Sequence, residues 1–260
     1  MAGTVRLGRH GPVAQVLLDR PEALNAFDLD MAGQLARHLA EVAADERVRG
    51  VVVGGSGRAF SAGGDLKWAL AHPAGAPVAF GELAGRFHEA VLAVRRMPKP
   101  VVAAVEGVAA GGGFSLALAC DFRVLGASAS LRLAYTSSGL GIDGGGTFTL
   151  PRLLGLARAL ELAAFDRPVP AARALELGLA TAVCEDGRAL EEATRMAAEL
   201  AGRSGHAFAM AKGLLDRSFE TTLSEQLERE RRGMVAAAEH PDGREGLAAF
   251  VAKRPPRFPG

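Results

Sequence analysis

The sequence predicts an α/β fold, and three features lead to this prediction. Short apolar runs rich in β-branched residues, such as Val101–Val105, are typical of buried strands. Glycine-rich corners follow two of these runs, and each corner opens a helix-forming segment. Strand and helix alternate through the first half, while the second half shows mainly helical periodicity. We therefore expect a sheet whose faces are covered by helices.

The first half is expected to open with a β-hairpin that turns at Gly11-Pro12. The segment 71–77, rich in Ala, Pro and Gly, is expected to be a loop over a site. The expected strands are Thr4–His10, Val13–Leu18, Gly50–Gly54, Val101–Val105, Phe122–Leu125 and Leu131–Ala134. One expected helix follows the N-cap Asp28 and runs to about Ala44, and a second opens at Leu66. Two more are expected over Phe80–Val94 and Phe114–Cys120.

Helical periodicity dominates from Phe148 onward, after a loop at 135–146. One short strand, Ala182–Cys184, interrupts the helices. We expect residues 1–200 to form a core that holds the site, and residues 201–260 to form a C-terminal helical region. The expected helices are Ala157–Phe165, Ala171–Leu177, Leu190–Leu200, Ala207–Leu215, Leu223–Ala238 and Gly243–Val251.

The composition is that of an ordinary globular protein and argues against several classes of function. The 260 residues carry a formal net charge of +1, which favours neither nucleic acid nor an anionic membrane surface as a partner. No apolar run approaches membrane-spanning length, and the N-terminus lacks the apolar core of a signal peptide. The cysteines and histidines show no metal-ligand spacing. We expect a cytoplasmic protein without a metal.

The two glycine corners are candidate sites for a negatively charged oxygen. One is FSAGGDL at Phe60–Leu66, and the other is Gly111–Gly113 with the helix that follows. Backbone N–H groups at a helix N-terminus are unpaired and carry partial positive charge, and glycine lets them approach a ligand without a Cβ in the way. The alternative interpretation is that both corners are only tight turns.

These corners and several further motifs, in order over most of the chain, resemble the enoyl-CoA hydratase/isomerase (crotonase) family. Each motif alone is a weak signal, whereas the ordered set is a strong one. The motifs are RPEALNA at Arg20–Ala26, FSAGGDL at Phe60–Leu66, PKPVVAAVEGVAAGGG followed by LACD at Pro98–Asp121, GLGIDGGGTFTLPRLLG at Gly139–Gly155, ALELGLA at Ala174–Ala180 and FVAKRPPRF at Phe250–Phe258.

The resemblance implies a crotonase-like spiral of ββα turns with a C-terminal helical oligomerisation region, assembled as a homotrimer or hexamer. It also implies acyl-CoA substrates whose thioester oxygen accepts from the N–H groups of Gly64 and Gly112, with no cofactor beyond the CoA moiety. Two such donors suit the enolate that forms when carbon beside a thioester loses a proton. Further substrate contacts implied are Leu24, Ala26, Ala62, Asp65, Leu66 and Ser115, with Phe250 and Lys253 reaching the CoA of a neighbouring subunit.

The chain departs from the family's hydratases at the two positions where they carry glutamates. Ser115 and Tyr135 stand there, and neither is a carboxylate that could activate water. One acid remains nearby, Asp143. The chain resembles the family's ring-epoxyphenylacetyl-CoA isomerases at this position, because they also carry an aspartate there. A single carboxylate can remove a proton from one carbon and return it to another. The alternative for Asp143 is a turn cap.

His88 is the remaining candidate, on the helix expected over Phe80–Val94. The family's 4-chlorobenzoyl-CoA dehalogenases resemble this chain in a histidine at that position, an aromatic at Tyr135 and a nucleophilic aspartate at Asp143. The isomerases instead carry Asn at the histidine position. Two roles therefore stay open for the Asp143 carboxylate, that of a nucleophile and that of a proton shuttle. The candidate catalytic residues are Asp143, Gly64, Gly112, His88 and Tyr135.

The function that these residues favour is an isomerase that moves a double bond of an enoyl-CoA from the β,γ to the α,β position. Dehalogenation, thioester hydrolysis, ring rearrangement and hydration at the same site stay open. A second class is a serine hydrolase using Ser115, since Asp166 and His206 follow in hydrolase order. A third is a non-catalytic CoA-binding protein. The GxGxxG match at 139–144 lacks a preceding strand, so we reject a dinucleotide site.

Overall fold

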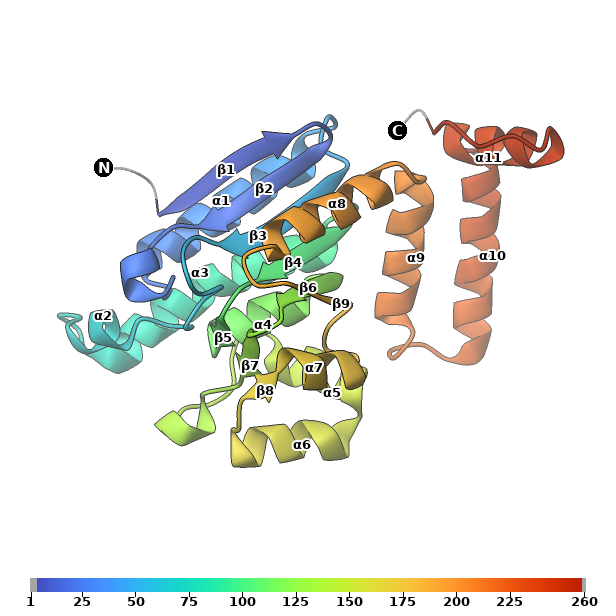
Figure 1. The fold of residues 1–260 in the computed structure, drawn as a ribbon. Coiled ribbons are helices and arrows are strands. Elements are labelled where there is room, and N and C mark those ends of the chain that lie inside the picture. Colours follow the sequence, from blue (N-terminus) through green and yellow to red (C-terminus); the bar gives the residue numbers. More distant parts are fainter. Residues whose placement is uncertain (1–3, 259–260) are drawn as a thin grey trace.

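The computed structural model describes residues 4–258 and shows two β-sheets covered by helices (Figure 1). The α/β class expected from the sequence is confirmed. The larger sheet has the strand order β1-β2-β3-β4-β6-β9, and the smaller has the order β5-β7-β8. The strands are β1 (Val5–His10), β2 (Val13–Leu18), β3 (Gly50–Gly55), β4 (Val101–Val105), β5 (Val108–Ala110), β6 (Phe122–Gly126), β7 (Ser130–Arg132), β8 (Val169–Pro170) and β9 (Ala182–Cys184).

Parallel pairing brings the two glycine corners to one edge of the larger sheet. After the β1–β2 hairpin, each later pair of described neighbours in this sheet is parallel, with Val16 opposite Val53 and Val53 opposite Ala103. All residues of β4 are buried, as expected for a parallel strand covered on both faces. Because parallel strands end at the same edge, the corners that follow β3 and β4 can meet there.

Helices cover both faces of the larger sheet (Figure 1). On one face α1 packs against α3, and on the other α8 crosses β2, β3 and β4. A Cβ added to Gly50 of β3 would lie 2.9 Å from the carbonyl oxygen of Ala197, so glycine permits the close approach of α8. The helices are α1 (Leu29–Ala44), α2 (Leu66–Leu70), α3 (Ala76–Arg96), α4 (Gly112–Ala119), α5 (Gly146–Leu154), α6 (Leu156–Phe165), α7 (Ala171–Glu176), α8 (Ala189–Ala201), α9 (Gly205–Arg217), α10 (Leu223–Glu239) and α11 (Pro241–Val251).

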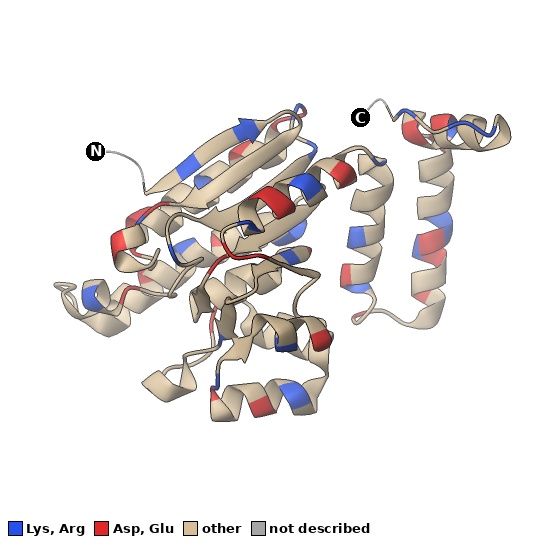
Figure 2. Ribbon diagram, in the orientation of Figure 1, with Lys and Arg blue, Asp and Glu red and all other residues tan. Residues whose placement is uncertain are grey.

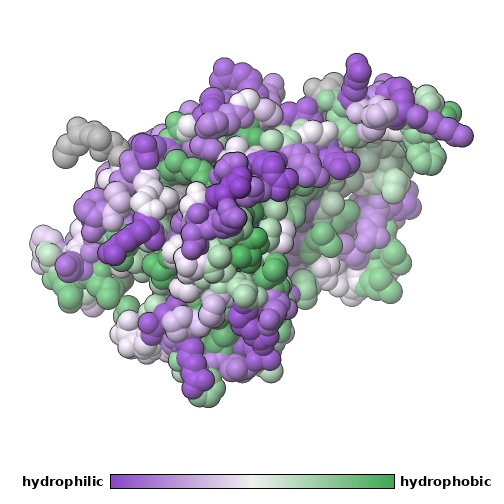
Figure 3. All heavy atoms as spheres, in the orientation of Figure 1, coloured by the Kyte–Doolittle hydropathy of each residue, from purple (hydrophilic) through white to green (hydrophobic). Residues whose placement is uncertain are grey.

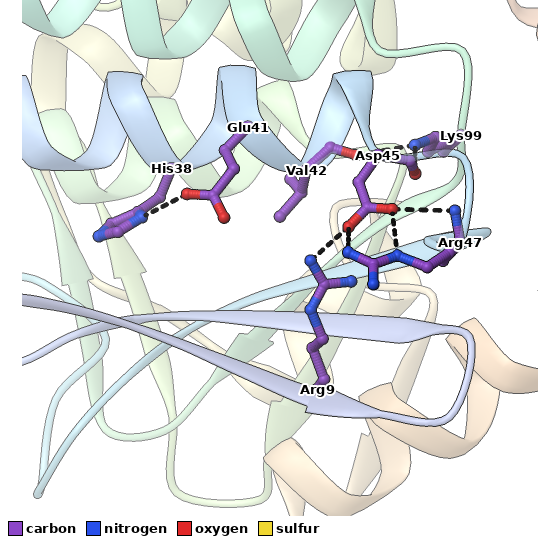
Figure 4. Close-up of polar contacts among 7 residues, drawn as sticks. All are labelled: Arg9, His38, Glu41, Val42, Asp45, Arg47 and Lys99. Carbon is purple, nitrogen blue, oxygen red and sulfur yellow. Dashed lines mark hydrogen bonds and ion pairs between the residues drawn. The ribbon is translucent and has the colours of Figure 1, made fainter.

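Both ends of α1 are capped. At its start the Asp28 carboxylate accepts from the N–H of Met31, as the sequence predicts. At its end Lys99 Nζ donates to the carbonyl oxygens of Val42 and Asp45, at 2.7 Å each (Figure 4). Terminal helix carbonyls lack helical partners and carry partial negative charge, so a cation satisfies them. Hydrogen bonds from Arg47 and Arg9 hold the pKa of the Asp45 carboxyl well below its usual range.

Several expected boundaries are wrong, each for a local reason. Helix α3 begins at Ala76, so the expected loop 71–77 is shorter, because Pro77 fits the first turn of a helix. Strand β7 ends at Arg132 rather than Ala134, whose φ of 55° is left-handed. Helix α5 was not among the helices whose bounds were expected, because it follows two glycines, begins at a third, Gly146, and contains Pro151. Strands β5 and β8 are too short to show a period.

The C-terminal helices α9, α10 and α11 form an arm that projects from the body (Figure 1). A largely buried ion pair joins this arm to the core: Lys212 Nζ on α9 lies 2.9 Å from Asp121 Oδ2 and 3.1 Å from the carbonyl oxygen of Val94. Basic and acidic side chains are mixed along α8, α9 and α10 (Figure 2). Because α8 ends at Ala201, the expected boundary at residue 200 falls at the base of the arm. That division stays a prediction.

Removal of the Lys212 ammonium should loosen the arm. In the Lys212→Ala variant the Asp121 carboxylate would stay buried without its partner, which typically costs roughly 3–5 kcal/mol of unfolding free energy. Urea unfolding at fixed protein concentration measures the loss. The double variant Lys212→Ala/Asp121→Asn removes the stranded charge and should recover part of it. Equal losses in both variants would contradict this role for the charge.

Candidate functional site

A cavity of about 480 Å³ lies between α2, α3 and the two glycine corners. Its walls are mainly apolar. Phe27 and Phe87 meet there with ring centroids 4.8 Å apart. The cavity is lined by Phe27, Ala62, Gly64, Leu66, Phe80, Gly81, Leu83, Ala84, Phe87, Gly111, Gly112, Ala134, Tyr135, Ser138, Leu140, Gly141 and Asp143. A hydrophobic chamber of this size with a few convergent polar groups is typical of a small-molecule site.

The first glycine corner is fixed by the loop that precedes α1. The fully buried amide of Asn25 donates to the carbonyl oxygens of Ser56 and Ala59, at 2.9 and 2.8 Å. Ser61 Oγ donates in turn to the Asn25 carbonyl oxygen and accepts from the N–H of Gly63. These bonds hold the corner in one conformation, so the N–H of Gly64 keeps a set direction.

The second corner is the start of α4. Gly111 adopts a φ of 53°, and the helix begins at Gly112 with every one of its residues buried. Behind it, Arg123 Nη1 donates to the carbonyl oxygen of Cys120 at 2.6 Å, at the other end of the helix. Cys120 is buried in the core, and burial raises the pKa of its thiol to about 12. Helix α4 therefore points its positive end at the cavity.

The two corners touch backbone to backbone. A Cβ added to Gly63 would lie 2.8 Å from the carbonyl oxygen of Ala110 and 3.1 Å from the nitrogen of Gly112. Phe27 pairs with the chain on either side of Gly64, through Gly63 and Asp65. Among the backbone bonds of residues 4–258, none uses the N–H of Gly64 or of Gly112. Two unpaired donors thus line one cavity, the arrangement of an oxyanion hole.

Asp143 is the acid on the cavity wall, and His88 is its neighbour. His88 Nε2 lies 2.5 Å from Asp143 Oδ1, across from α3 to the loop before α5. Both side chains are partly exposed, at 49% for His88 and 38% for Asp143. The structure therefore brings into contact two residues that the resemblance to the dehalogenases suggested.

Tyr135 and Ser115 hold the backbone of Asp143 rather than its carboxylate. Ser115 Oγ donates to the Asp143 carbonyl oxygen at 2.6 Å, and Tyr135 Oη donates to the same oxygen at 3.2 Å. Burial raises the pKa of Tyr135 to about 12, against a lowering contact with Ser115. Next in the chain, Gly144 has a φ of 64°, and a Cβ there would lie 2.4 Å from the Phe87 ring. The chain around Asp143 is thus fixed on both sides.

The remaining expected substrate contacts lie outside the cavity lining. Ala26 is buried, the Leu24 carbonyl accepts from the N–H of Ala62, and the Asp65 carboxylate caps α2 and pairs with Arg20 at 3.0 Å. Asp65 thus has a structural task. Phe250 and Lys253 are exposed on the arm, and their contact with a neighbouring subunit's CoA stays a prediction. The residues so placed are Leu24, Ala26, Asp65, Ser115, Phe250 and Lys253.

The structure does not support a serine-hydrolase triad. Ser115 lies inside α4 with 1% exposure, not at a strand-to-helix elbow. Within residues 4–258, Ser115, Asp166 and His206 form no hydrogen bonds with one another, and His206 stacks on His240 instead. In the part of the chain that the structure describes, these three residues are therefore not connected as the nucleophile and base that this mechanism needs.

Sequence reasoning missed most of the apolar wall. Phe87 and Leu83 lie on the buried face of α3, and helical periodicity does not separate residues of the core from residues of a cavity wall. Phe27 follows the RPEALNA motif without belonging to it. Asn25, which fixes the first corner, belongs to that motif, but the sequence predicted no separate role for it. An uncharged polar residue between apolar neighbours in a loop was the available signal.

The comparisons with known proteins now decide the family. The model of the family described as enoyl-CoA hydratase/isomerase matches residues 8–260. The chain belongs to the enoyl-CoA hydratase/isomerase (crotonase) family. Proteins of this family are enzymes that act on acyl-CoA substrates and are usually oligomeric. The resemblance drawn from the sequence motifs is confirmed.

Relatives across the family carry both kinds of name. A 1,2-epoxyphenylacetyl-CoA isomerase of Escherichia coli is 37% identical over 249 residues, which are 95% of each chain. A probable enoyl-CoA hydratase of Rhodobacter capsulatus is 36% identical, covering 99% of this chain and 98% of that protein. The crystal structure of an enoyl-CoA hydratase from a Polaromonas species superposes with a TM-score of 0.93 at 39% identity, covering 97% and 98% of the two chains.

Proposed function

We propose that this enzyme moves the double bond of an enoyl-CoA from the β,γ to the α,β position. The observation that carries the proposal is a single cavity containing two unpaired N–H donors, those of Gly64 and Gly112, and one carboxylate, that of Asp143. The donors would hold the thioester oxygen. The carboxylate would supply the acid–base chemistry, with no cofactor beyond the CoA moiety of the substrate.

In this mechanism Asp143 removes a proton from the carbon between the thioester carbonyl and the double bond. The electron pair spreads into the thioester oxygen, where the N–H groups of Gly64 and Gly112 stabilise the negative charge. Asp143 then returns its proton to the far end of the original double bond, which leaves a conjugated thioester. His88 contacts the carboxylate and Tyr135 the backbone of Asp143, so both act as positioning residues.

Hydration is the less favourable assignment even though several relatives are named hydratases. Addition of water needs one group to activate the water and another to protonate carbon. Ser115 is buried and donates to a backbone carbonyl, and burial keeps the Tyr135 phenol protonated at neutral pH. Asp143 is then the one carboxylate in the cavity lining of the described chain.

The test supplies a 3-enoyl-CoA in deuterated water to the purified protein. We expect the absorbance of a conjugated 2-enoyl thioester to rise, and mass spectrometry to follow deuterium in the product. A product heavier by one water would show hydration instead. Tight binding of the thioester with no change in its mass or absorbance would favour the non-catalytic alternative.

The contact between His88 and Asp143 supports a second candidate, in which the carboxylate acts as a nucleophile. Asp143 would displace CoA from a thioester to form a mixed anhydride, or displace halide from an aryl-CoA to form an aryl ester, and His88 would activate the water that cleaves this intermediate. A single turnover in H₂¹⁸O distinguishes the two functions. Hydrolysis of either intermediate places the label in the Asp143 carboxylate or in the product, whereas isomerisation labels neither.

We further propose that the protein assembles as a homotrimer or hexamer through the arm. Hydrophobic surface gathers along the arm and around α2 (Figure 3). Phe250 and Leu223 on the arm are 83% and 75% exposed, and apolar side chains that gather on one part of a surface are typical of an association site. Light scattering should give three or six times the mass of one chain. A concentration-independent monomer would contradict the assembly.

A further inference from the structure

Asp166 is a buried carboxylate to which the proposed mechanism assigns no task. It follows α6, is 4% exposed, and adopts a left-handed backbone with a φ of 47°. A non-glycine residue in this region carries strain, although aspartate tolerates it better than most. Contacts with the surrounding structure must compensate for this strain.

Its two carboxylate oxygens bind the segment that precedes Asp143. Oδ1 accepts from the N–H of Ala134 at 2.6 Å, and Oδ2 accepts from the N–H of Ser137 at 3.0 Å. Burial alone would raise the pKa of Asp166, but hydrogen bonds from Ser137 and Ala134 and the charge of Arg132 bring it below its ordinary value. Arg132 Nε also donates to the Asp166 carbonyl oxygen at 2.9 Å. The carboxylate is therefore ionised and fully engaged at neutral pH.

The segment held in this way forms one wall of the cavity. Ala134, Tyr135, Leu140 and Asp143 all line it, along with Ser138 and Gly141. Apart from a short turn at 136–138 the segment has no regular structure, and residues 136–141 are exposed on the outside. Its conformation must come from specific anchors. Asp166 holds its start, and Tyr135 links that start to the backbone of Asp143.

We propose that Asp166 is a positioning residue that fixes residues 134–143, and through Tyr135 sets where the Asp143 carboxylate stands relative to the two N–H donors. The donors belong to other segments, so the loss of Asp166 displaces the acid and leaves the oxyanion site in place. This role rests on the proposed function for its catalytic consequence, but its structural consequence is independent of the reaction.

The test compares Asp166→Gly and Asp166→Asn with the wild type. Glycine accepts the left-handed backbone without strain and removes both acceptors and the charge beside Arg132, so its effect reports the loss of the carboxylate and not a strained backbone. Asparagine keeps one acceptor oxygen and turns an N–H₂ toward the other donor, so its effect should be intermediate. Lys99→Met is the matched control. It removes two hydrogen bonds to backbone carbonyls at α1, away from the cavity lining.

The chain contains a single tyrosine, so its ionisation reports on Tyr135 alone. Because the pKa of Tyr135 in the wild type is about 12, about one-tenth of its phenol should be ionised just after a jump to pH 11. Absorbance at 295 nm measures this fraction. In Asp166→Gly a released, solvated phenol with a pKa of ~10 should be mostly ionised at that pH. The raised pKa of Tyr135 also contributes to the stability of the fold. This contribution is fully present below pH ~10 and is lost as the pH rises toward 12. The absorbance must therefore be read before the protein unfolds.

The second reading is the kinetics of 3-enoyl-CoA conversion. Asp166→Gly should lower kcat by roughly 10- to 100-fold per folded protein, because small displacements of a catalytic group are costly, while KM changes less. Unchanged Tyr135 ionisation in Asp166→Gly, or a shift equal to that of Lys99→Met, would overturn the proposal, as would a wild-type kcat. A Tyr135 shift in a chain that does not convert 3-enoyl-CoA would support the positioning role and refute only the isomerase.

Discussion

The Asp143→Asn variant should lose the isomerase activity almost completely. Asparagine has nearly the shape of aspartate but cannot accept a proton from carbon, and general acid–base catalysis typically contributes 10²–10⁴-fold. We therefore expect kcat for 3-enoyl-CoA to fall by roughly that factor. Binding of the thioester should persist, because the donors of Gly64 and Gly112 are untouched. Absorbance of the conjugated product gives kcat, and calorimetry with a non-isomerisable acyl-CoA gives the affinity.

His88→Asn is the matched control for that experiment. It changes the neighbour of Asp143 to a smaller side chain that still carries an N–H donor, and it leaves the base itself intact. We expect its kcat to fall much less than that of Asp143→Asn. If His88→Asn were as inactive as Asp143→Asn, the proton carrier would be the pair and not the carboxylate alone. Full activity in Asp143→Asn would remove Asp143 from the mechanism.

The sequence predicted the features of the site that depend on local chemistry. Short buried strands followed by glycines indicated two corners, and the structure brings Gly63 of one corner against Gly112 of the other. Parallel pairing of β3 and β4 explains this meeting, because it carries both corners to one edge. The capping role of Asp28 was also predictable, since an N-cap depends on residues within one turn.

Contacts between distant residues could not be predicted in the same way. Asp166 lies 32 residues from Ala134, and no period or spacing connects them. The contact of His88 with Asp143 spans 55 residues, so resemblance to family positions could suggest the pair, whereas spacing could not. Ser115 and Tyr135 both donate to the backbone carbonyl oxygen of Asp143. Every residue has such a carbonyl, so the sequence does not indicate which one is used. Such arrangements depend on tertiary packing, which one sequence does not display.

The Gly63→Ala variant should lose activity through displacement of the oxyanion donors. Gly63 has a φ of 92°, and an added Cβ would lie 2.8 Å from the Ala110 carbonyl oxygen and 3.1 Å from the Gly112 nitrogen. All the nearest atoms are backbone, so the two corners must move apart. Loss of one oxyanion donor typically costs about 2.7–4 kcal/mol of barrier, or 10²–10³ in kcat. We expect a decrease in kcat of this order, measured as for Asp143→Asn.

Gly178→Ala separates this effect from backbone strain. Gly178 has a φ of 75°, and an added Cβ would meet nothing within 4 Å, so this variant carries the cost of a left-handed alanine without a collision. Both variants should lose stability, but kcat per folded protein should fall only in Gly63→Ala. Equal kcat in the two variants would mean that the corners tolerate separation, and that the thioester oxygen does not depend on both N–H groups. Because Asp143 is unchanged in Gly63→Ala, exchange of substrate protons with deuterated water should fall in step with kcat, since the missing enolate stabilisation limits both.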